Sequence, residues 1–308
     1  MAIQVEEIMR KQSARIAMND IPIEEMNILT PEDVVTIAPS DKNFDLESEL
    51  SKIIGLDGVK DYIRSLSARL RMQNERKKLG LAIDSTQTLH MIFKGNPGTG
   101  KTMVARTVAK VLYNIGVINT NKLVETDRAG LVAGYVGQTA IKTREKVMEA
   151  MDGVLFIDEA YSLSQGGAND FGKEAIDTLV KLMDDYRDRI VVILAGYSKD
   201  MDQFLSVNPG LKSRFPNIIE FPDYTTEQLM QISELFFKSK GYELSPQAQT
   251  KLEEILSEAK KDAQFGNGRY VRNVFERAIN NQALRLSNDV KLTKEQLITI
   301  TDEDIERV

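Results

Sequence analysis

The sequence of 308 residues contains no cysteine and only one histidine, His90. The chain therefore forms no disulfide bond, thiolate metal site or cysteine nucleophile, and a reducing compartment suits it. His90 lies in a mostly apolar, strand-like run and is expected to be packed or hydrogen-bonded in the core. Because the only histidine is expected in the core and cysteine is missing, zinc sites and Ser-His-Asp chemistry are effectively excluded.

Long apolar runs are missing as well, and so is an excess of positive charge. No stretch approaches the ~20 apolar residues of a membrane-spanning helix, and the first residues, with Glu6 and Glu7, lack the apolar core of a signal peptide. We therefore expect a cytoplasmic protein with no membrane partner. The net charge of −6 and the pI of about 5.2 argue against nucleic acid as a partner, because nucleic-acid-binding proteins are more often basic.

Residues 95–102, the phosphate loop, fit the pattern G-x-x-x-x-G-K-[ST]. An apolar run precedes the loop and a helical apolar spacing follows it, which is the order of strand, loop and helix that the motif requires. Glycines let backbone N–H groups approach phosphate oxygens at a helix N-terminus. Lys101 is expected to bind the β- and γ-phosphates, and Thr102 to offer a hydroxyl to Mg²⁺. The predicted ATP-binding residues of the loop are Gly95, Asn96, Pro97, Gly98, Thr99, Gly100, Lys101 and Thr102.

A second motif indicates hydrolysis. Residues 154–159 consist of four apolar residues followed by Asp158 and Glu159. At the end of a buried strand beside the phosphate loop, Asp158 would hold Mg²⁺ through water, and Glu159 would act as the general base on the attacking water. The alternative is an ordinary strand that ends in an acidic turn.

The order of the apolar runs predicts an α/β fold. Five short runs, at residues 89–94, 122–125, 153–157, 190–195 and 218–221, alternate with helical stretches. This is typical of a parallel sheet that is covered on both faces. After residue 222 the pattern is helical only. We predict three parts: a leader over residues 1–44, an α/β ATPase domain over 45–222, and a helical lid over 223–308. The leader is expected to be partly helical or disordered, and the alternative is a docking segment for a partner or a neighbouring subunit.

Two arginines stand where they would complete the site. Arg214 follows a tight turn before the last strand and would reach the γ-phosphate of a neighbouring subunit in a ring. The alternative is a surface arginine that pairs with a local carboxylate. Arg269 opens a lid helix and would report the bound nucleotide to the lid. Arg272 is the second candidate for that role. The alternative is an ordinary helix start at which both arginines face solvent.

These motifs together resemble the AAA+ ATPases of the CbxX/CfqX group, which includes the red-type Rubisco activases, from about Leu50 to Leu286. The shared stretches are residues 89–91, 95–102, 135–140, 155–161, 194–197, 208–210 and 221–224. Sporulation-associated members of the group match residues 171–181 and 268–273 most closely.

The resemblance implies a P-loop NTPase fold with strand order 5-1-4-3-2 and a helical lid. It also implies ATP and Mg²⁺ as ligands and a nucleotide-dependent homo-hexamer. Arg214 takes the place of the arginine finger and Arg269 that of the lid arginine known as sensor 2. Ile54 and Gly55 match the segment that packs on adenine. Many AAA+ proteins carry an asparagine, sensor 1, after the fourth strand, where this chain has Tyr197 and Ser198.

Tyr135, Val136 and Gly137 match the loop that lines the central pore of protein-remodelling AAA+ members. An aromatic side chain on a mobile loop grips a peptide by packing, whatever its sequence. The alternative is a tyrosine buried between subunits. Residues 164–168 would form either a second pore loop or a surface turn.

The sequence therefore predicts a ring motor that hydrolyses ATP and remodels an unidentified protein partner. A nucleic-acid-acting loader and a nucleotide-switched scaffold are the alternatives. The resemblance does not name the partner, because a shared motor says little about what it acts on.

Overall fold

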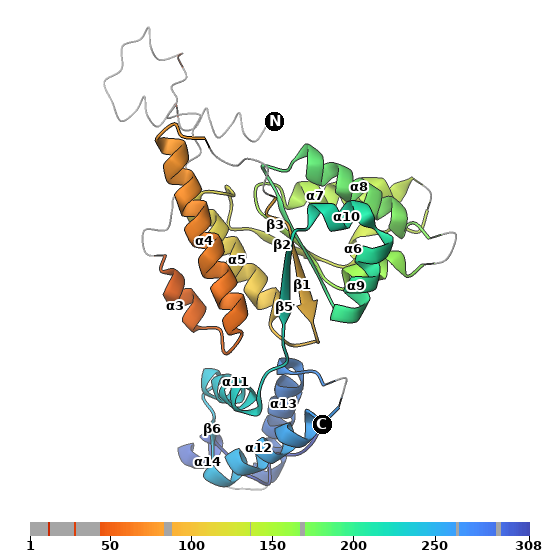
Figure 1. The fold of residues 1–308 in the computed structure, drawn as a ribbon. Helices are drawn as coiled ribbons and strands as arrows, with labels where there is room; N and C mark the ends of the chain where they lie inside the picture. Colours follow the sequence, from red (N-terminus) through yellow and green to blue (C-terminus); the bar gives the residue numbers. More distant parts are fainter. Residues whose placement is uncertain are drawn as a thin grey trace.

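The computed structural model describes residues 12, 28, 44–82, 88–135, 137–166, 170–262, 265–287 and 291–308. Figure 1 shows a larger body with a central sheet and, next to the carboxyl ends of its strands, a smaller helical body. The predicted leader, apart from positions 12, 28 and 44, lies outside the described residues, and so do Val136 and residues 167–168 of the predicted pore loops.

The sheet has five parallel strands in the order β2-β3-β4-β1-β5, which is the predicted order 5-1-4-3-2 read from the other edge. The strands are β1 (Met91–Gly95), β2 (Leu123–Thr126), β3 (Val154–Ile157), β4 (Val191–Gly196) and β5 (Asn217–Phe221). Strands β1, β3 and β4 are buried along their whole length, which explains why β3 and β4 read as continuous apolar runs and why Lys94 is the only charged residue in β1.

His90 precedes β1 and is 3% exposed. Its Nδ1 accepts a hydrogen bond from the backbone N–H of Val192 at 3.0 Å. Burial lowers the pKa of the imidazole to about 4, against a smaller opposing effect of Asp184. The single histidine is therefore neutral at pH 7, and its predicted role as a packed core residue is confirmed.

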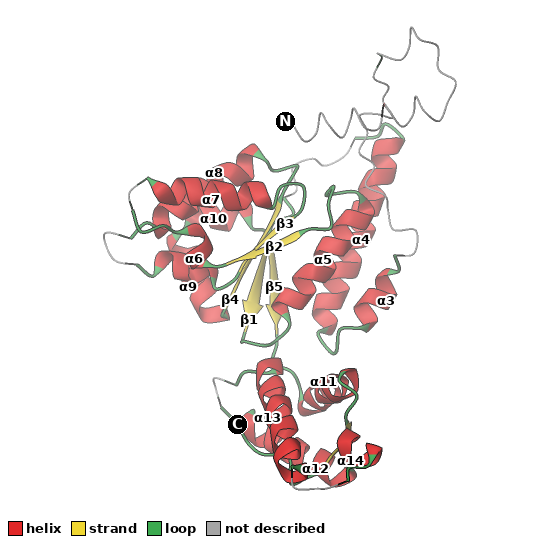
Figure 2. Cartoon of the chain, turned by 180° about the vertical axis from the view of Figure 1, so that it is seen from behind, coloured by secondary structure: helices red, strands yellow, loops and turns green. Residues whose placement is uncertain are grey.

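Helices cover both faces of the sheet (Figures 1 and 2). One face carries α3 (Leu46–Ser51), α4 (Asp57–Lys78) and α5 (Lys101–Ile115). The other carries α6 (Arg128–Leu131), α7 (Gln138–Glu149), η2 (Ala160–Ser164), α8 (Gly172–Asp185), α9 (Ser198–Val207) and α10 (Pro209–Arg214). Alternate strand residues enter two separate apolar cores, with Phe93 in one and Ile92 in the other, as the two-residue period of a strand requires.

The smaller body is helical, as predicted. It comprises α11 (Thr226–Ser239), α12 (Pro246–Ala259), α13 (Gly268–Leu286) and α14 (Lys294–Ile298). The short parallel strands β6 (Glu243–Leu244) and β7 (Thr299–Ile300) also pair there. The sequence did not reveal this pair, because two residues are too few to show an alternation. Within the described part of the chain, no helix is long and apolar enough to cross a membrane.

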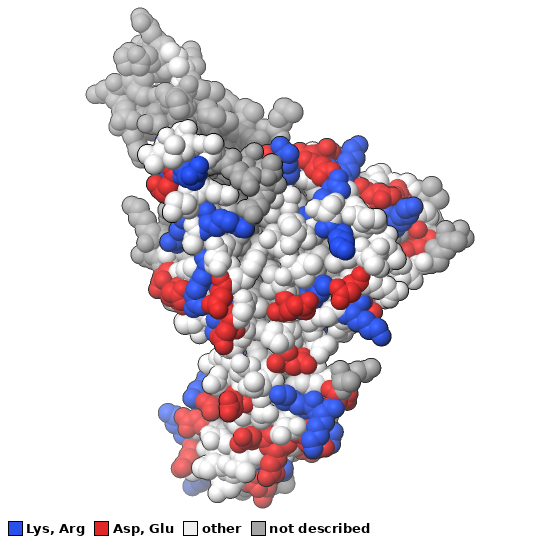
Figure 3. Space-filling model, in the orientation of Figure 1, with Lys and Arg blue, Asp and Glu red and all other residues white. Residues whose placement is uncertain are grey.

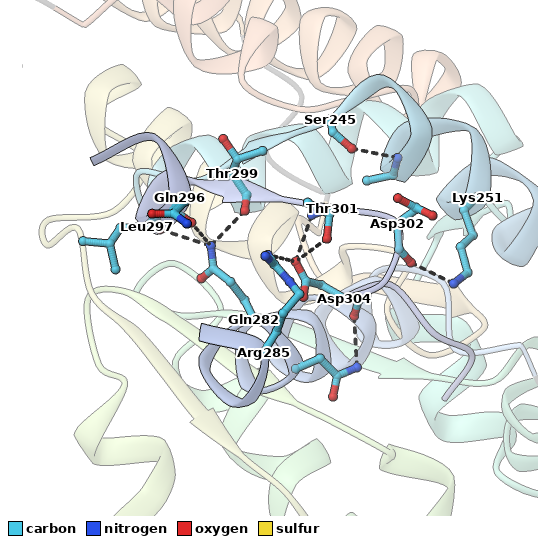
Figure 4. A network of polar contacts seen from close by, with 12 residues as sticks. Ser245, Lys251, Gln282, Arg285, Gln296, Leu297, Thr299, Thr301, Asp302 and Asp304 are labelled. Atoms are coloured by element: carbon cyan, nitrogen blue, oxygen red, sulfur yellow. Dashed lines mark hydrogen bonds and ion pairs between the residues drawn. The ribbon is translucent and has the colours of Figure 1, made fainter. Parts of the chain in front are cut away.

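A buried carboxylate holds the end of the chain on α13 (Figure 4). Asp304 is 1% exposed and receives two hydrogen bonds from Arg285, Nε to Oδ1 at 2.8 Å and Nη2 to Oδ2 at 2.7 Å. Thr301 donates to Oδ2 through its backbone N–H and its hydroxyl. Burial alone raises the pKa of Asp304, but these donors together hold it below its usual range. Asp304 therefore stays ionised at neutral pH.

We expect Asp304→Asn to lower the free energy of unfolding by about 2 kcal/mol at pH 7, because Arg285 loses its carboxylate. The folded pKa is depressed, so this stabilisation is present above the unfolded pKa of about 3.9 and is lost as the pH falls through the folded value. Urea unfolding at pH 7 and at pH 3 should show the difference from wild type shrinking at the lower pH. Glu306→Gln, which removes the solvent-exposed partner of Arg277, is the control and should leave stability close to that of wild type at both pH values.

Candidate active site

A cavity of about 560 Å³ is lined by residues of both bodies. The carboxyl ends of the strands face the smaller body (Figure 2). The larger body lines the cavity with Ile54, Pro97, Lys101, Thr102, Asp158 and Glu159, and the smaller body with Ile232, Leu235, Phe236, Ser239, Arg269 and Arg272. Ligands of parallel α/β sheets bind at this end of the strands, and the volume is within the range of small-molecule sites. We call this space the interdomain cavity.

The phosphate loop forms one wall of the interdomain cavity. Gly98 has a φ of 70°, and a Cβ atom there would lie 2.2 Å from the carbonyl oxygen of Gly266, so no larger residue fits without movement of the backbone. Gly100, with a φ of 91°, precedes the first turn of α5. The N-terminus of this 15-residue helix opens at the loop, where its unpaired N–H groups and dipole favour an anion.

Lys101 folds across the phosphate loop. Its Nζ donates to the carbonyl oxygens of Gly95 and Asn96, both at 2.8 Å. Burial lowers the pKa of its ammonium group, the Asp158 carboxylate opposes this shift, and the Arg269 charge adds to it. Lys101, Asp158 and Arg269 thus lie close enough in the interdomain cavity to act on the same ligand.

The two carboxylates follow β3 directly. Asp158 Oδ1 accepts from the backbone N–H of Glu159 at 3.0 Å. Glu159 has a φ of 47°, a left-handed conformation that is uncommon outside glycine and is often found at functional sites. Besides the interdomain cavity, Glu159 lines a second hollow with residues 127–129, 132–134 and Ser162. It therefore stands between the interdomain cavity and the segment that leads to Tyr135.

Arg214 does not line the interdomain cavity of its own chain. Its Nε and Nη2 donate to the two carboxylate oxygens of Asp184 at 2.9 and 2.6 Å, and its carbonyl accepts from the hydroxyl of Thr88. Thr88 precedes β1, whereas the phosphate loop follows it, so the length of a five-residue strand, roughly 16 Å, separates the two. The local pairing that the sequence allowed as an alternative is present within the chain.

Tyr135 also lies outside the interdomain cavity, in the loop between α6 and α7, and 74% of it is exposed. Gly137 follows with a φ of 78° as the N-cap of α7. Of the two residues predicted to pack on adenine, Ile54 lines the cavity. Gly55 instead packs against the Gln228 side chain, whose Nε2 would lie 2.5 Å from an added Cβ.

The structure distinguishes residues that the sequence left equivalent. Tyr197 lines the interdomain cavity, whereas the Ser198 hydroxyl donates to Glu220 at 3.2 Å. Arg269 and Arg272 both line the interdomain cavity. They differ in that the guanidinium of Arg272 lies over the Phe236 ring, with Cζ 5.6 Å from the ring centre.

The sequence did not predict that apolar side chains of the smaller body belong to the candidate active site. Ile232, Leu235 and Phe236 line the interdomain cavity. The positions of these residues in the sequence follow helical spacing, but spacing alone does not say which part of a helix face packs in a core and which lines a cavity. The exposed fraction of Leu235, 54%, is a signal that only the structure provides.

Two family models match the chain. The model of the ATPase family associated with various cellular activities (AAA) matches residues 91–223. The model of the AAA lid domain matches residues 225–308.

Several characterised proteins are similar over most of their length. Stage V sporulation protein K of Bacillus subtilis (strain 168) is 47% identical over 264 residues, which cover 85% of this chain and 82% of that protein. Protein CbbX of Cereibacter sphaeroides is 44% identical, with 84% of this chain and 85% of that protein covered. The chloroplastic ribulose bisphosphate carboxylase/oxygenase activase of Cyanidioschyzon merolae is 41% identical, with 91% and 98% covered.

A solved structure, the FIGL-1 AAA domain in complex with ADP, resembles the chain with a TM-score of 0.57 over 86% of this chain and 90% of that one. At 20% sequence identity, this likeness supports the fold alone. The family models and the relatives at 41–47% identity go further. The chain belongs to the AAA family of ATPases, in the group that includes stage V sporulation protein K and CbbX, and it is an enzyme that binds and hydrolyses ATP.

Proposed function

We propose that the interdomain cavity is the ATP site and that hydrolysis there drives a homo-hexameric ring that remodels a protein partner. The observation that carries the proposal is the meeting of the phosphate loop, both carboxylates and Arg269 in one cavity that the smaller body closes. In this proposal residues 45–222 form the ATPase domain, residues 223–308 the lid, and residues 1–44 the leader.

The residues present fit Mg²⁺ bound together with a nucleotide. Thr102 and Asp158 supply oxygen atoms to the same cavity. Among the described residues, no group of three or more His, Cys, Asp or Glu side chains would hold a metal ion by itself. A site with few protein ligands suits Mg²⁺, which usually keeps several waters and binds substrate phosphates. When bound, the ion would neutralise phosphate charge.

Each side chain then has a separate task. Lys101 and the N-terminus of α5 would hold the phosphates, and Ile54 with the apolar lid wall would surround the base. Glu159 would orient the attacking water and accept its proton. Arg269 would act as sensor 2 from the lid, since Arg272 is stacked on Phe236. Tyr197 would take the sensor 1 position, because it, rather than the Ser198 hydroxyl, faces the cavity.

Four observations support a protein as the partner. Tyr135 is a largely exposed aromatic residue, and Glu159 touches both the interdomain cavity and the hollow that leads toward Tyr135. One relative is named as the activase of an enzyme. Figure 3 shows acidic and basic side chains intermixed on the face in view, without the basic stripe that a nucleic-acid-acting loader would present there. Failure of any captured partner to change conformation would favour a nucleotide-switched scaffold instead.

We expect Tyr135→Ala to weaken capture of the partner while ATP hydrolysis without partner stays within about twofold of wild type, because Tyr135 lies outside the interdomain cavity. Capture is measured by affinity purification with ATP in a Glu159→Gln background, which holds the ATP state. Loss of the exposed aromatic ring should lower recovery by roughly tenfold. Tyr135→Phe, which keeps the ring, should restore it, and Ile141→Ala, on the exposed side of α7, should have little effect. Equal recovery with Tyr135→Ala would remove Tyr135 from the pore-loop role.

A further inference from the structure

The backbone carbonyl groups of residues 95–99 in the phosphate loop each accept a hydrogen bond. Those of Gly95 and Asn96 accept from Lys101, which belongs to the loop itself. The next three accept from the segment after β5 and from the start of α13. The Pro97 carbonyl accepts from Asn267 Nδ2 at 3.4 Å, the Gly98 carbonyl from Gly268 N at 3.1 Å, and the Thr99 carbonyl from the Tyr224 hydroxyl at 3.1 Å.

These carbonyl contacts control where the loop N–H groups point. No peptide bond in the described part of the chain is cis, and in a trans peptide the carbonyl and the next N–H point in opposite directions. The Gly268 N–H on the Gly98 carbonyl and the Tyr224 hydroxyl on the Thr99 carbonyl therefore set the directions of the Thr99 and Gly100 N–H groups. The longer contact of Asn267 Nδ2 with the Pro97 carbonyl, which the amide shares with the Phe265 carbonyl at 3.4 Å, favours one direction of the Gly98 N–H. Burial raises the pKa of Tyr224 to about 12, so this hydroxyl keeps its proton.

Asn267 is the centre of the contact. It is 0% exposed, and its Nδ2 donates to Asp223 Oδ1 at 2.7 Å while its Oδ1 accepts from the backbone N–H of Tyr224 at 3.0 Å. Asp223 in turn accepts from Asn96 Nδ2, at 3.0 Å to Oδ1 and 2.9 Å to Oδ2. A continuous polar chain thus joins the phosphate loop, the segment after β5 and the start of α13.

The backbone of Asn267 indicates that the side chain is what this position needs. Its φ of 46° and ψ of −123° lie in a region that glycine adopts freely and other residues rarely enter. Glycine stands on both sides, at positions 266 and 268, yet the strained position carries asparagine. Strain of this kind persists where the surrounding contacts outweigh it.

We propose that Asn267 is a positioning residue that, with Gly268 and Tyr224, holds the phosphate loop in its nucleotide-binding shape from the lid side. Nucleotide affinity then depends on where the lid stands, and the dependence runs through the loop carbonyls rather than through an arginine on the nucleotide. This inference rests on the nucleotide site proposed above. It differs from the role of Arg269, which would contact the nucleotide directly.

The test is ADP binding to the full-length protein, followed with a fluorescent ADP analogue at equilibrium and by stopped-flow release. Asn267→Gly relieves the backbone and removes the donor to Pro97. We expect the variant to melt close to the wild-type temperature, to bind ADP about tenfold more weakly and to release it about tenfold faster. The KM for ATP should rise by a similar factor while kcat changes less than about threefold, because Glu159 is untouched.

Two further variants keep the test decisive. Tyr224→Phe removes only the hydroxyl on the Thr99 carbonyl and should weaken ADP binding by about threefold. Asn281→Ala is the matched control, since this asparagine of α13 donates to the Asp304 carbonyl at 3.0 Å, inside the lid, and its loss should leave ADP affinity unchanged. Wild-type affinity and release in both Asn267→Gly and Tyr224→Phe would overturn the proposal. Lys101→Ala separates the two hypotheses: unimpaired ADP binding by that variant would overturn the nucleotide site itself.

Discussion

Replacement of Glu159 by glutamine is expected to lower the rate of ATP turnover by about 10²- to 10⁴-fold while ATP still binds. Glutamine keeps the size of the side chain and one acceptor oxygen, but it does not take a proton from the attacking water. Glu159 lines the interdomain cavity beside Asp158 and Lys101, and its left-handed backbone is a local feature that the substitution does not alter. The effect should therefore fall on kcat, with nucleotide affinity within about threefold of wild type.

The matched control for this prediction is Glu125→Gln. Glu125 lies on β2 opposite Phe156 of β3, and its carboxylate pairs with Arg106 outside the interdomain cavity. The substitution therefore removes only an exposed ion pair on the neighbouring strand. The rate of ATP turnover by the Glu125→Gln variant should stay within about twofold of wild type. Phosphate release and binding of a fluorescent ATP analogue are measured on both variants. Substantial turnover by Glu159→Gln would show that another group is the general base.

The parts of the molecule that follow from local sequence were predictable. Strand, phosphate loop and helix are consecutive in the chain, so residues 91–115 carry their own pattern, and the sheet order followed from the resemblance. The buried strand β3 ends where its apolar run ends, which places Asp158 and Glu159 at the cavity without knowledge of any tertiary contact.

The parts that depend on contacts between distant segments were not predictable. Asn96, Asp223 and Asn267 look like ordinary polar loop residues, and nothing in their spacing shows that their side chains meet. Whether Tyr197 or Ser198 faces the cavity depended on the turn after β4, which directs the serine hydroxyl to Glu220 instead. The end of the lid is similar, because the environment of Asp304 is created by Arg285 and Thr301 only in the folded state.

Replacement of Arg214 by alanine is expected to lower ATP turnover by about 10³-fold or more, which is the effect of losing a guanidinium that stabilises the transferring phosphoryl group. Arg214 lies at the opposite end of the strands from the phosphate loop of its own chain and is held there by Asp184. If it acts in catalysis, it therefore does so on a neighbouring subunit. This geometry makes a subunit-mixing experiment decisive.

Arg214→Ala and Lys101→Ala should each be inactive alone, for different reasons. In a mixed ring, an Arg214→Ala subunit has an intact phosphate loop, and a Lys101→Ala neighbour has an intact Arg214. In an equal mixture, half of the sites have the intact loop and half of their neighbours have the intact arginine. Up to about a quarter of wild-type turnover should thus return if the sites act independently. Light scattering with ATP shows whether the mixed rings have assembled.

The structure provides a matched control in Arg189. This arginine precedes β4 at the same end of the sheet and pairs with Asp152 through Nε and Nη2, just as Arg214 pairs with Asp184. Arg189→Ala loses an equivalent ion pair, so a merely structural role of Arg214 would give the two variants similar turnover. A mixture of Arg214→Ala and Lys101→Ala that assembles but stays inactive would show that Arg214 does not complete a neighbour's site. Recovered turnover, absent when either variant is measured alone, would establish that each ATP site is shared by two copies of this chain.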